Sequence, residues 1–217
     1  MKWNITLNML NQKTNKLIIT WVLNYAVITL FSLHNQQLHK TFSILAIYRN
    51  LYKQFQKMTL EKFFSSELIL ENDSIILRPL TINDIDSIES ISFHKELGEF
   101  GARVKNRNDL MDYFNFNLGA KTEKELYPLI IINKKTKDPI GITMFGNISF
   151  QHKRLEIGWT WIGKKFQGTG INASCKRLLL DYCFDSLDLR RVEFKIDIKN
   201  LKSQKAIEKI GAIKEQG

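Results

Sequence analysis

Two glycines separated by a single residue, Gly168 and Gly170, stand between an extended apolar run and a helical pattern. Glycine has no Cβ, so the main-chain amides of such a turn can approach a ligand closely. The first amides of the following helix have no acceptor inside that helix, and together with the helix dipole they favour an anion, most often a phosphate. The spacing therefore indicates a phosphate-binding turn, although a tight connection that only caps a core helix would use the same glycines.

The turn from Gln167 to Asn172 differs from two common nucleotide-binding motifs. It lacks the Gly-Lys-Ser/Thr ending of a P-loop, and it lacks the Gly-x-Gly-x-x-Gly order of a dinucleotide site. It also follows several predicted strands, whereas the dinucleotide fingerprint usually opens its domain. Both of those nucleotide-binding classes are therefore disfavoured.

The elements that must position this turn follow from hydrophobic periodicity and from turn residues. Thr81 and Asp84 resemble a capping box at the start of the first helix, and Gly119 is expected to end the second. The order is strand, helix, helix, three strands, helix, strand, helix, which predicts an α/β arrangement with a mixed sheet and helices on both faces. The predicted strands cover 75–80, 126–133, 139–148, 154–162 and 191–198, and the predicted helices cover 82–91, 109–118, 171–185 and 203–210.

The formal net charge of +10 is unevenly distributed along the chain. Residues 1–57 contain seven of the 32 basic residues and none of the 22 acidic ones, which leaves residues 58–217 at only +3. A nucleic-acid binder is therefore the weakest of the alternatives. The apolar run from Leu17 to Leu33 is at the lower limit for a membrane span, so a tethered protein is one alternative. We expect instead that residues 1–57 are an extension with no share in the fold, and that the domain begins at Met58.

Cysteine and histidine usage argues against disulfides and metals. Cys175 and Cys183 lie eight residues apart in one predicted helix, which puts them beyond disulfide reach, and a reducing, cytoplasmic setting follows. The four histidines are scattered without metal-ligand spacing, so no metal is expected.

The string Gln167-Gly168-Thr169-Gly170-Ile171-Asn172 resembles the Gln/Arg-x-x-Gly-x-Gly/Ala signature of the GNAT superfamily, which binds the pyrophosphate of acetyl-CoA. The flanking sequences resemble the Rim branch, whose named members acetylate the N-termini of ribosomal proteins. The resemblance covers 58–217, but Asn172 replaces the final small residue and the closing pair of C-terminal strands is largely missing. The flanking matches are Leu155–Trp159, Arg191–Phe194, Asn200–Ser203 and Lys209–Ala212.

This resemblance implies an N-acetyltransferase with a mostly antiparallel central sheet. The enzyme would move an acetyl group from acetyl-CoA to a primary amine, by direct attack in a ternary complex. The amine would be a protein N-terminus or a small molecule, chosen by the stretch Ser92–Lys121. Dimers are common in the resembling branch, and a non-catalytic module that binds or senses acyl-CoA is the main alternative.

The resemblance also assigns roles to particular residues. The turn 167–172 would hold the pyrophosphate, and backbone groups around Trp159, Trp161 and Ile162 would orient the thioester in a splay between two strands. Asn200 would contact the pantetheine amides, or it would only cap a helix. Glu156 is the candidate general base, unless it is a solvated strand residue. A tyrosine acid that many members use is replaced by Ile207, so the candidate general acid is Ser203 or water.

Overall fold

The computed structural model describes residues 2–7, 58–93 and 104–215. Its strands form one eight-stranded sheet in the order β2-β3-β4-β5-β6-β7-β1-β8. Neighbouring strands are antiparallel except β6 and β7, which are parallel. The predicted mixed, mostly antiparallel sheet is therefore confirmed. The strands are β1 Lys2–Leu7, β2 Leu70–Glu71, β3 Ile75–Pro79, β4 Leu126–Asn133, β5 Pro139–Ser149, β6 Arg154–Ile162, β7 Arg191–Asp197 and β8 Ile213–Glu215.

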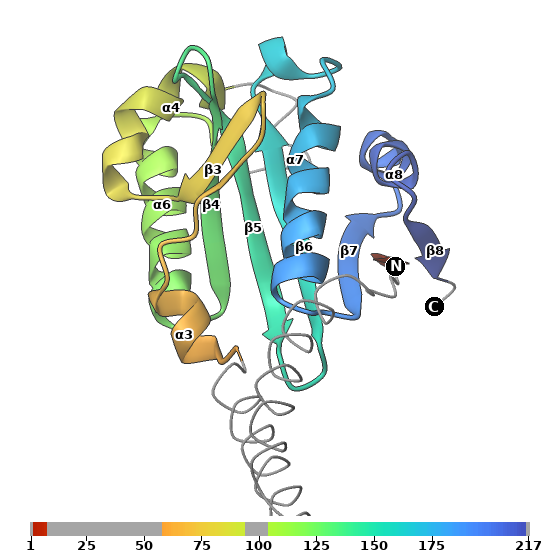
Figure 1. Ribbon diagram of the computed structural model, residues 1–217. Helices are drawn as coiled ribbons and strands as arrows, with labels where there is room; N and C mark the ends of the chain where they lie inside the picture. The colour runs from red at the N-terminus through yellow and green to blue at the C-terminus, as the bar shows by residue number, and fades with distance from the viewer. Residues whose placement is uncertain (1, 8–57, 94–103, 216–217) are drawn as a thin grey trace, which may run out of the picture. The chain divides into compact units, whose positions relative to one another are not determined.

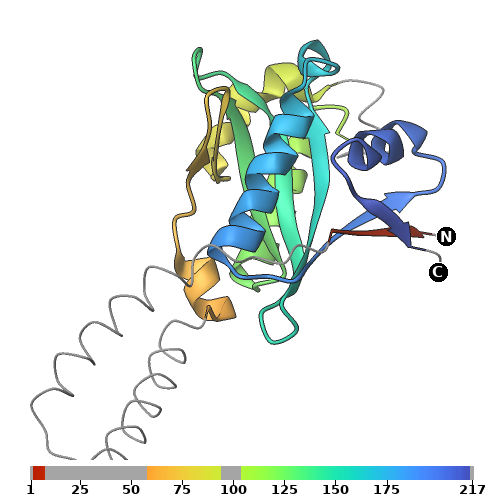
Figure 2. The same cartoon turned by 45° about the vertical axis from the view of Figure 1, so that its right-hand side comes forward.

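Helices cover both faces of this sheet, as predicted from the element order. α4 and α6 pack on one face, and α7 crosses the other (Figures 1 and 2). No helix within the described ranges is long and apolar enough to span a membrane, and the predicted apolar run from Leu17 to Leu33 lies outside those ranges. The helical segments are α3 Leu60–Ser65, η1 Ile82–Asp84, α4 Ile85–Ser92, α6 Arg107–Thr122, η2 Lys164–Phe166, α7 Ile171–Asp181, the π-helical turn η3 Tyr182–Ser186 and α8 Leu201–Glu208.

Each face of the sheet has its own core. On the face covered by α4 and α6, Ile142 and Trp161 of the central strands pack with Leu110 and Phe114 of α6. On the other face, the fully buried ring of Phe63 from α3 lies 4.9 Å from Tyr127 and 6.0 Å from Phe145, between ring centroids. The central strands are buried on both sides and can therefore position a site rigidly.

Helix starts were easier to predict than helix ends. The expected capping box is present, since Thr81 and Asp84 exchange side-chain and main-chain hydrogen bonds and Arg78 pairs with Asp84 at 2.5 Å. The expected end of the second helix at Gly119 is wrong, because α6 runs from Arg107 to Thr122. Gly119 does not take the left-handed φ with which a glycine ends a helix, and Lys124, just after α6, takes it instead with φ of 61°.

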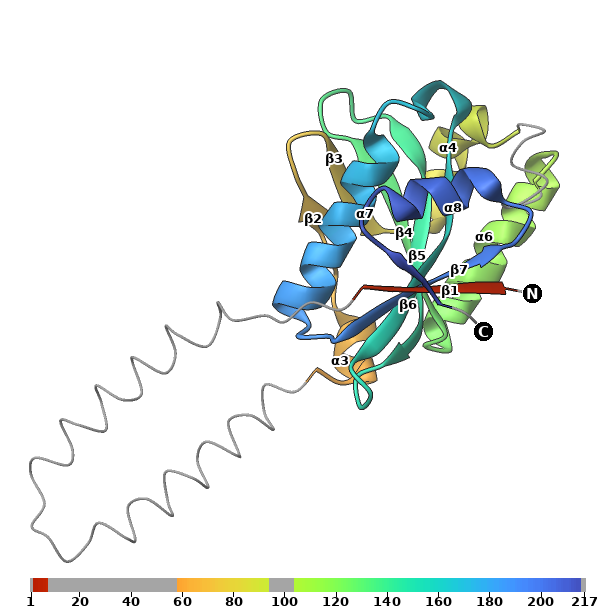
Figure 3. The ribbon, with the colours of Figure 1, turned by 90° about the vertical axis from the view of Figure 1, so that its right-hand side faces the viewer.

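The strand β1 lies between β7 and β8 (Figure 3). It pairs with β7 over six residues and with β8 over three, and among the described strands β8 has no other partner. Arg191 of β7 and Glu215 of β8 form a bidentate pair, with nitrogen to oxygen distances of 2.7 and 2.6 Å. We expected residues 1–57 to take no part in the fold; Lys2–Leu7 departs from that expectation, and 8–57 lie outside the described residues.

Candidate active site

The turn before α7 offers a row of free main-chain donors. Gly168 and Gly170 have φ values of 79° and 87°, the left-handed region that glycine adopts without strain. The helix has no side-chain cap, and the first main-chain bond at its start runs from Ser174 N to Gly170 O at 3.0 Å. Within the described chain, the amides from Gly168 to Ala173 donate to no protein acceptor.

The space in front of these donors is open. An added Cβ at Gly168 or Gly170 would meet no heavy atom within 4 Å, and both glycines are exposed. The glycines are therefore required by their backbone angles and not by crowding. Free amides at a helix start, facing open space, fit the diphosphate of a coenzyme A ligand.

The side chain of Gln167 ties the turn to two neighbouring elements. Its Nε2 donates to the main-chain oxygen of Ile162 at the end of β6, at 3.0 Å. Its Oε1 accepts from Nζ of Lys202 in α8, at 2.5 Å. Thr169 closes the turn internally, because its hydroxyl donates to Phe166 O at 2.6 Å. The structure thus brings the predicted residues of the turn together with Ile162 and with the start of α8.

β6 and β7 diverge from each other next to this turn. They pair for only three residues, from Arg154 with Arg191 to Glu156 with Glu193, although β6 continues to Ile162 and β7 to Asp197 (Figure 1). This is the splay that the resemblance implied. A ligand held at the turn can therefore extend between two strands whose main-chain groups there are not paired with each other.

A bulge in β6 reverses the alternation of its side chains between the two faces of the sheet. The bulge lies in the part of β6 that has separated from β7. The register against β5 shifts between Ile142 and Met144, and Trp159 lies there with φ of 50° and 45% of its surface exposed. The alternating sequence of β6 predicts that Trp159 and Trp161 share one face with Leu155 and Ile157, and because of the bulge this prediction is wrong. Trp161 instead joins the core under α4 and α6, and its indole donates to Tyr113 Oη at 3.3 Å.

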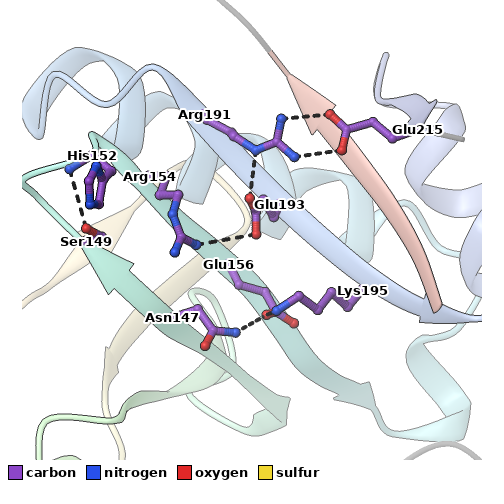
Figure 4. A network of polar contacts seen from close by, with 9 residues as sticks. All are labelled: Asn147, Ser149, His152, Arg154, Glu156, Arg191, Glu193, Lys195 and Glu215. Atoms are coloured by element: carbon purple, nitrogen blue, oxygen red, sulfur yellow. Dashed lines mark hydrogen bonds and ion pairs between the residues drawn. The ribbon is translucent and has the colours of Figure 1, made fainter. Parts of the chain in front are cut away.

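Glu156 is buried, with 4% of its surface exposed, so the alternative of a solvated strand residue is wrong. Its Oε2 accepts from Asn147 Nδ2 at 2.5 Å and pairs with Lys195 Nζ at 2.8 Å (Figure 4). It is also the last residue of β6 that pairs with β7. A carboxylate held by two donors at the base of the splay can accept a proton, but an incoming amine must compete with Lys195.

A second charged group lies beside Glu156 on the same strands. Glu193 is buried and pairs with Arg191 at 2.7 Å and with Arg154 at 3.7 Å (Figure 4). Hydrogen bonds that Arg191 donates to the carboxylates of Glu215 and Glu193 raise its pKa. These contacts fasten β6, β7 and β8 to one another below the diverging segment.

The start of α8 is organised by Asn200. Its Oδ1 accepts from Ser203 N at 3.1 Å, which makes Asn200 the helix cap, as one of the two expectations had it. Ser203 is half-buried in the first turn, and Ile207 is buried at the position where the resemblance implied a tyrosine. A contact between Asn200 and a pantetheine arm, or proton donation by Ser203, stays a prediction.

Sequence reasoning missed three polar residues of this region: Asn147, Lys195 and Lys176. Asn147 lies at a positive φ of 47° near the end of β5, and no sequence signal pointed to it. Lys176, in contrast, precedes Leu179 and Leu180 by three and four residues, so helical spacing put it on the buried side of α7. Within the described ranges, no group of His, Cys, Asp or Glu could hold a metal ion.

Comparison with known proteins agrees with this geometry. A family model described as an acetyltransferase (GNAT) domain matches residues 74–213. The chain is 26% identical over 152 residues to the uncharacterized N-acetyltransferase p20 of Bacillus licheniformis. The aligned stretch covers 67% of this chain and 83% of that protein. A stretch of 75 residues, 35% of this chain and 40% of the relative, is 36% identical to a Bacillus subtilis (strain 168) protein named provisionally as ribosomal N-acetyltransferase YdaF.

A solved structure from Vibrio cholerae, provisionally titled a ribosomal-protein-serine acetyltransferase, matches with a TM-score of 0.62. The match covers 69% of this chain and 85% of that one at 19% identity, so it supports the fold alone. Because the family model spans more than half of the chain, this protein belongs to the GNAT acetyltransferase family and is an acyltransferase.

Proposed function

We propose that this protein transfers an acetyl group from acetyl-CoA to a primary amine, with a protein N-terminus as the first candidate acceptor. The observation that carries the proposal is the open row of amides from Gly168 to Ala173, placed where β6 and β7 separate. One end of a long ligand would be held by its phosphates while its other end extends between the strands. This arrangement supports an acyl-CoA ligand better than a compact nucleotide.

Acetyl-CoA supplies an acetyl group activated as a thioester. The residues 167–172 hold the pyrophosphate, and the main chain of the bulge from Trp159 to Ile162 orients the arm. Glu156 accepts a proton from the amine, directly or through water, and Asn147 and Lys195 keep its carboxylate in place. Asn200 contacts the arm, and Ser203 or water returns a proton to the leaving sulfur.

The preference for a protein N-terminus rests on the names of relatives. The 36% identical stretch belongs to a protein named as a ribosomal N-acetyltransferase. A small-molecule amine remains the second candidate acceptor. We also propose a homodimer. We further propose a cytoplasmic location, because the two buried cysteines, Cys175 and Cys183, are free thiols.

The turn is tested by replacing Gly170 with asparagine. Asparagine tolerates a positive φ, so the variant should fold, but its side chain would fill the space before the amides. We expect calorimetry with coenzyme A to show at least about tenfold weaker binding, equivalent to about 1.4 kcal/mol. Gly211→Asn is a matched control, because Gly211 has φ of 90°, has nothing within 4 Å and ends a different helix. Equal affinity in all three proteins, or no binding to the unchanged chain, would refute the proposal.

Glu156→Gln separates an enzyme from a non-catalytic acyl-CoA-binding module. With an acceptor found by screening amines and N-terminal peptides for thiol release, we expect the rate to fall by about 100-fold or more. Affinity for coenzyme A should stay within about twofold, because glutamine keeps the shape of the side chain and can still contact Asn147. An unchanged rate would show that Glu156 is not the base, and the absence of any turnover in the unchanged chain would favour the binding module.

A further inference from the structure

A lysine of α7 is buried between the diverging strands. Lys176 has 3% of its surface exposed. Its Nζ lies 2.5 Å from the hydroxyl oxygen of Thr160 in β6 and 5.7 Å from the ring centroid of Phe194 in β7. Both neighbours come after the last residues through which β6 and β7 pair. The amine therefore occupies the splay itself, approached from the face that α7 covers.

The buried amine of Lys176 has few polar partners to offset its loss of contact with water. Within the described residues no carboxylate lies within ion-pair distance of Lys176, and its one hydrogen-bond partner is Thr160, which also bonds Thr143 at 2.7 Å. A surface lysine usually extends its amine to water, but here the amine points inward. Burial lowers the pKa of Lys176 to about 8, against a small opposing effect of Cys175. About half of the Lys176 side chains are therefore neutral at a pH of about 8, and the neutral fraction grows above it.

A simple packing role does not explain the choice of lysine. The neighbouring buried positions of α7 are Cys175, Leu179 and Leu180, and a leucine or methionine at 176 would fill the same space without burying an amine. A desolvated lysine in an apolar pocket is a frequent solution for a nitrogen nucleophile. The amine of Lys176 lies in the gap where the thioester would lie, so the thioester carbonyl is the electrophile that this nucleophile would attack.

We propose that Lys176 is a self-acetylation site, whose ε-amine takes an acetyl group from an acetyl-CoA thioester bound in the splay between β6 and β7. This inference rests on the proposed function, since it needs the thioester to be bound there. The neutral nitrogen of Lys176 attacks the carbonyl carbon, the new C–N bond forms and the C–S bond breaks. The proton lost by nitrogen goes to the sulfur, so the products are an acetyl-lysine and free coenzyme A.

The modification has a selectivity that surface acetylation lacks. Lys164 and Lys165 are exposed beside the turn, so any acetyl donor in solution can reach them. Lys176 is shielded from solvent, so only a donor that is held at the turn and extends into the splay can reach it. Acetylation would also replace a buried cation by a neutral amide. A donor without the coenzyme A moiety should therefore label the two kinds of lysine differently.

The test is peptide mass mapping of the full chain after incubation, at a pH just above 8, with acetyl-CoA or with acetyl phosphate. We expect acetyl-CoA to place a single acetyl group on Lys176, with occupancy at least about tenfold above that on Lys164 or Lys165. Acetyl phosphate, which has no diphosphate arm for the turn, should label the surface lysines only. Gly170→Asn should lose the label on Lys176, whereas Gly211→Asn should keep it.

Two results would overturn the inference. One is an unmodified Lys176 peptide in a chain that calorimetry shows to bind coenzyme A, which would leave the proposed function intact. The other is equal labelling of Lys176 by both donors or in both glycine variants, which would show that the amine is reached from solvent. If coenzyme A does not bind at all, the proposed function fails first, and calorimetry reports this separately from the mass map.

Discussion

Replacing Lys176 with methionine is expected to raise the free energy of unfolding near pH 7 by about 3 kcal/mol. The pKa of Lys176 falls from 10.5 to about 8 because the amine is buried, and a tenfold change in a proton-binding constant corresponds to about 1.4 kcal/mol. Near pH 7 the folded protein carries a buried cation, and methionine removes it while filling the space of the aliphatic stem. The hydroxyl of Thr160 keeps its bond to Thr143, so the substitution leaves no unpaired group there.

The pH dependence has a definite sign. Between pH values of about 8 and 10.5 the unfolded chain binds the proton of Lys176 and the folded chain has lost it, so the cost of burying this amine falls as pH rises through this window. The advantage of the methionine variant should therefore be largest below pH 8 and should shrink as pH approaches 10.5. Burial also raises the pKa of the neighbouring Cys175 from 9.0 to about 11, so between these values the unfolded thiol loses its proton before the folded one and stability falls as pH rises. Both proteins carry Cys175, so the difference in stability between them isolates the effect of Lys176.

Chemical denaturation at several pH values measures both effects. Lys165→Met is the matched control: Lys165 is exposed, and its substitution should change the free energy of unfolding by no more than about 0.5 kcal/mol. Equal stability of the unchanged chain and Lys176→Met near pH 7 would mean that the amine reaches water. A stabilised Lys176→Met variant would indicate that the lysine is kept at the expense of stability.

A chain that begins at Met58 should be less stable than the full chain by several kcal/mol. Such a chain lacks β1, whose removal separates β8 from the sheet and leaves an edge of β7 open. Main-chain hydrogen bonds contribute about 1 kcal/mol each, and β1 pairs with two strands. The bidentate contact between Arg191 and Glu215 would lose its support as well. Open strand edges also promote association, so the shorter chain should aggregate at lower concentration.

The control replaces residues 10–57 with a Gly/Ser segment of equal length and keeps 2–7. If the strand alone matters, this variant should keep the denaturation midpoint of the full chain, whereas the chain from Met58 should not. A synthetic peptide of residues 1–9 added to the shorter chain should restore part of the loss. Equal stability of the short and full chains would show that β1 contributes nothing to the sheet in solution.

The fold was predictable where local sequence and tertiary structure agree. The strand from Leu126 to Asn133 and the strand from Arg154 to Ile162 have the predicted bounds, because each is a β-branched or aromatic run bounded by polar residues. The cap at Thr81 was also found, since its contacts lie within a few residues. The glycine turn was found because a positive φ demands a residue type that stands out in a sequence.

What could not be predicted depends on partners far apart in the chain. The bulge at Trp159 is a mismatch of register with β5, so no pattern within β6 reveals it. The pairing of Glu156 with Lys195 joins residues from different strands, and β1 joins the sheet across most of the chain. Lys176 is hard to predict for a different reason: lysine side chains are usually solvated, although the spacing of Lys176 places it on the buried side of α7.

The place of β1 also affects how the protein can be made. Asn4 pairs with Glu215, so one of the two strands that meet at this end of the sheet is synthesised long before the other. The elements between them can begin to collapse while the chain is still growing, but β1 must wait until β7 and β8 have been synthesised. During translation, β1 would therefore stay available to chaperones, or to neighbouring nascent chains, until β7 has left the ribosome.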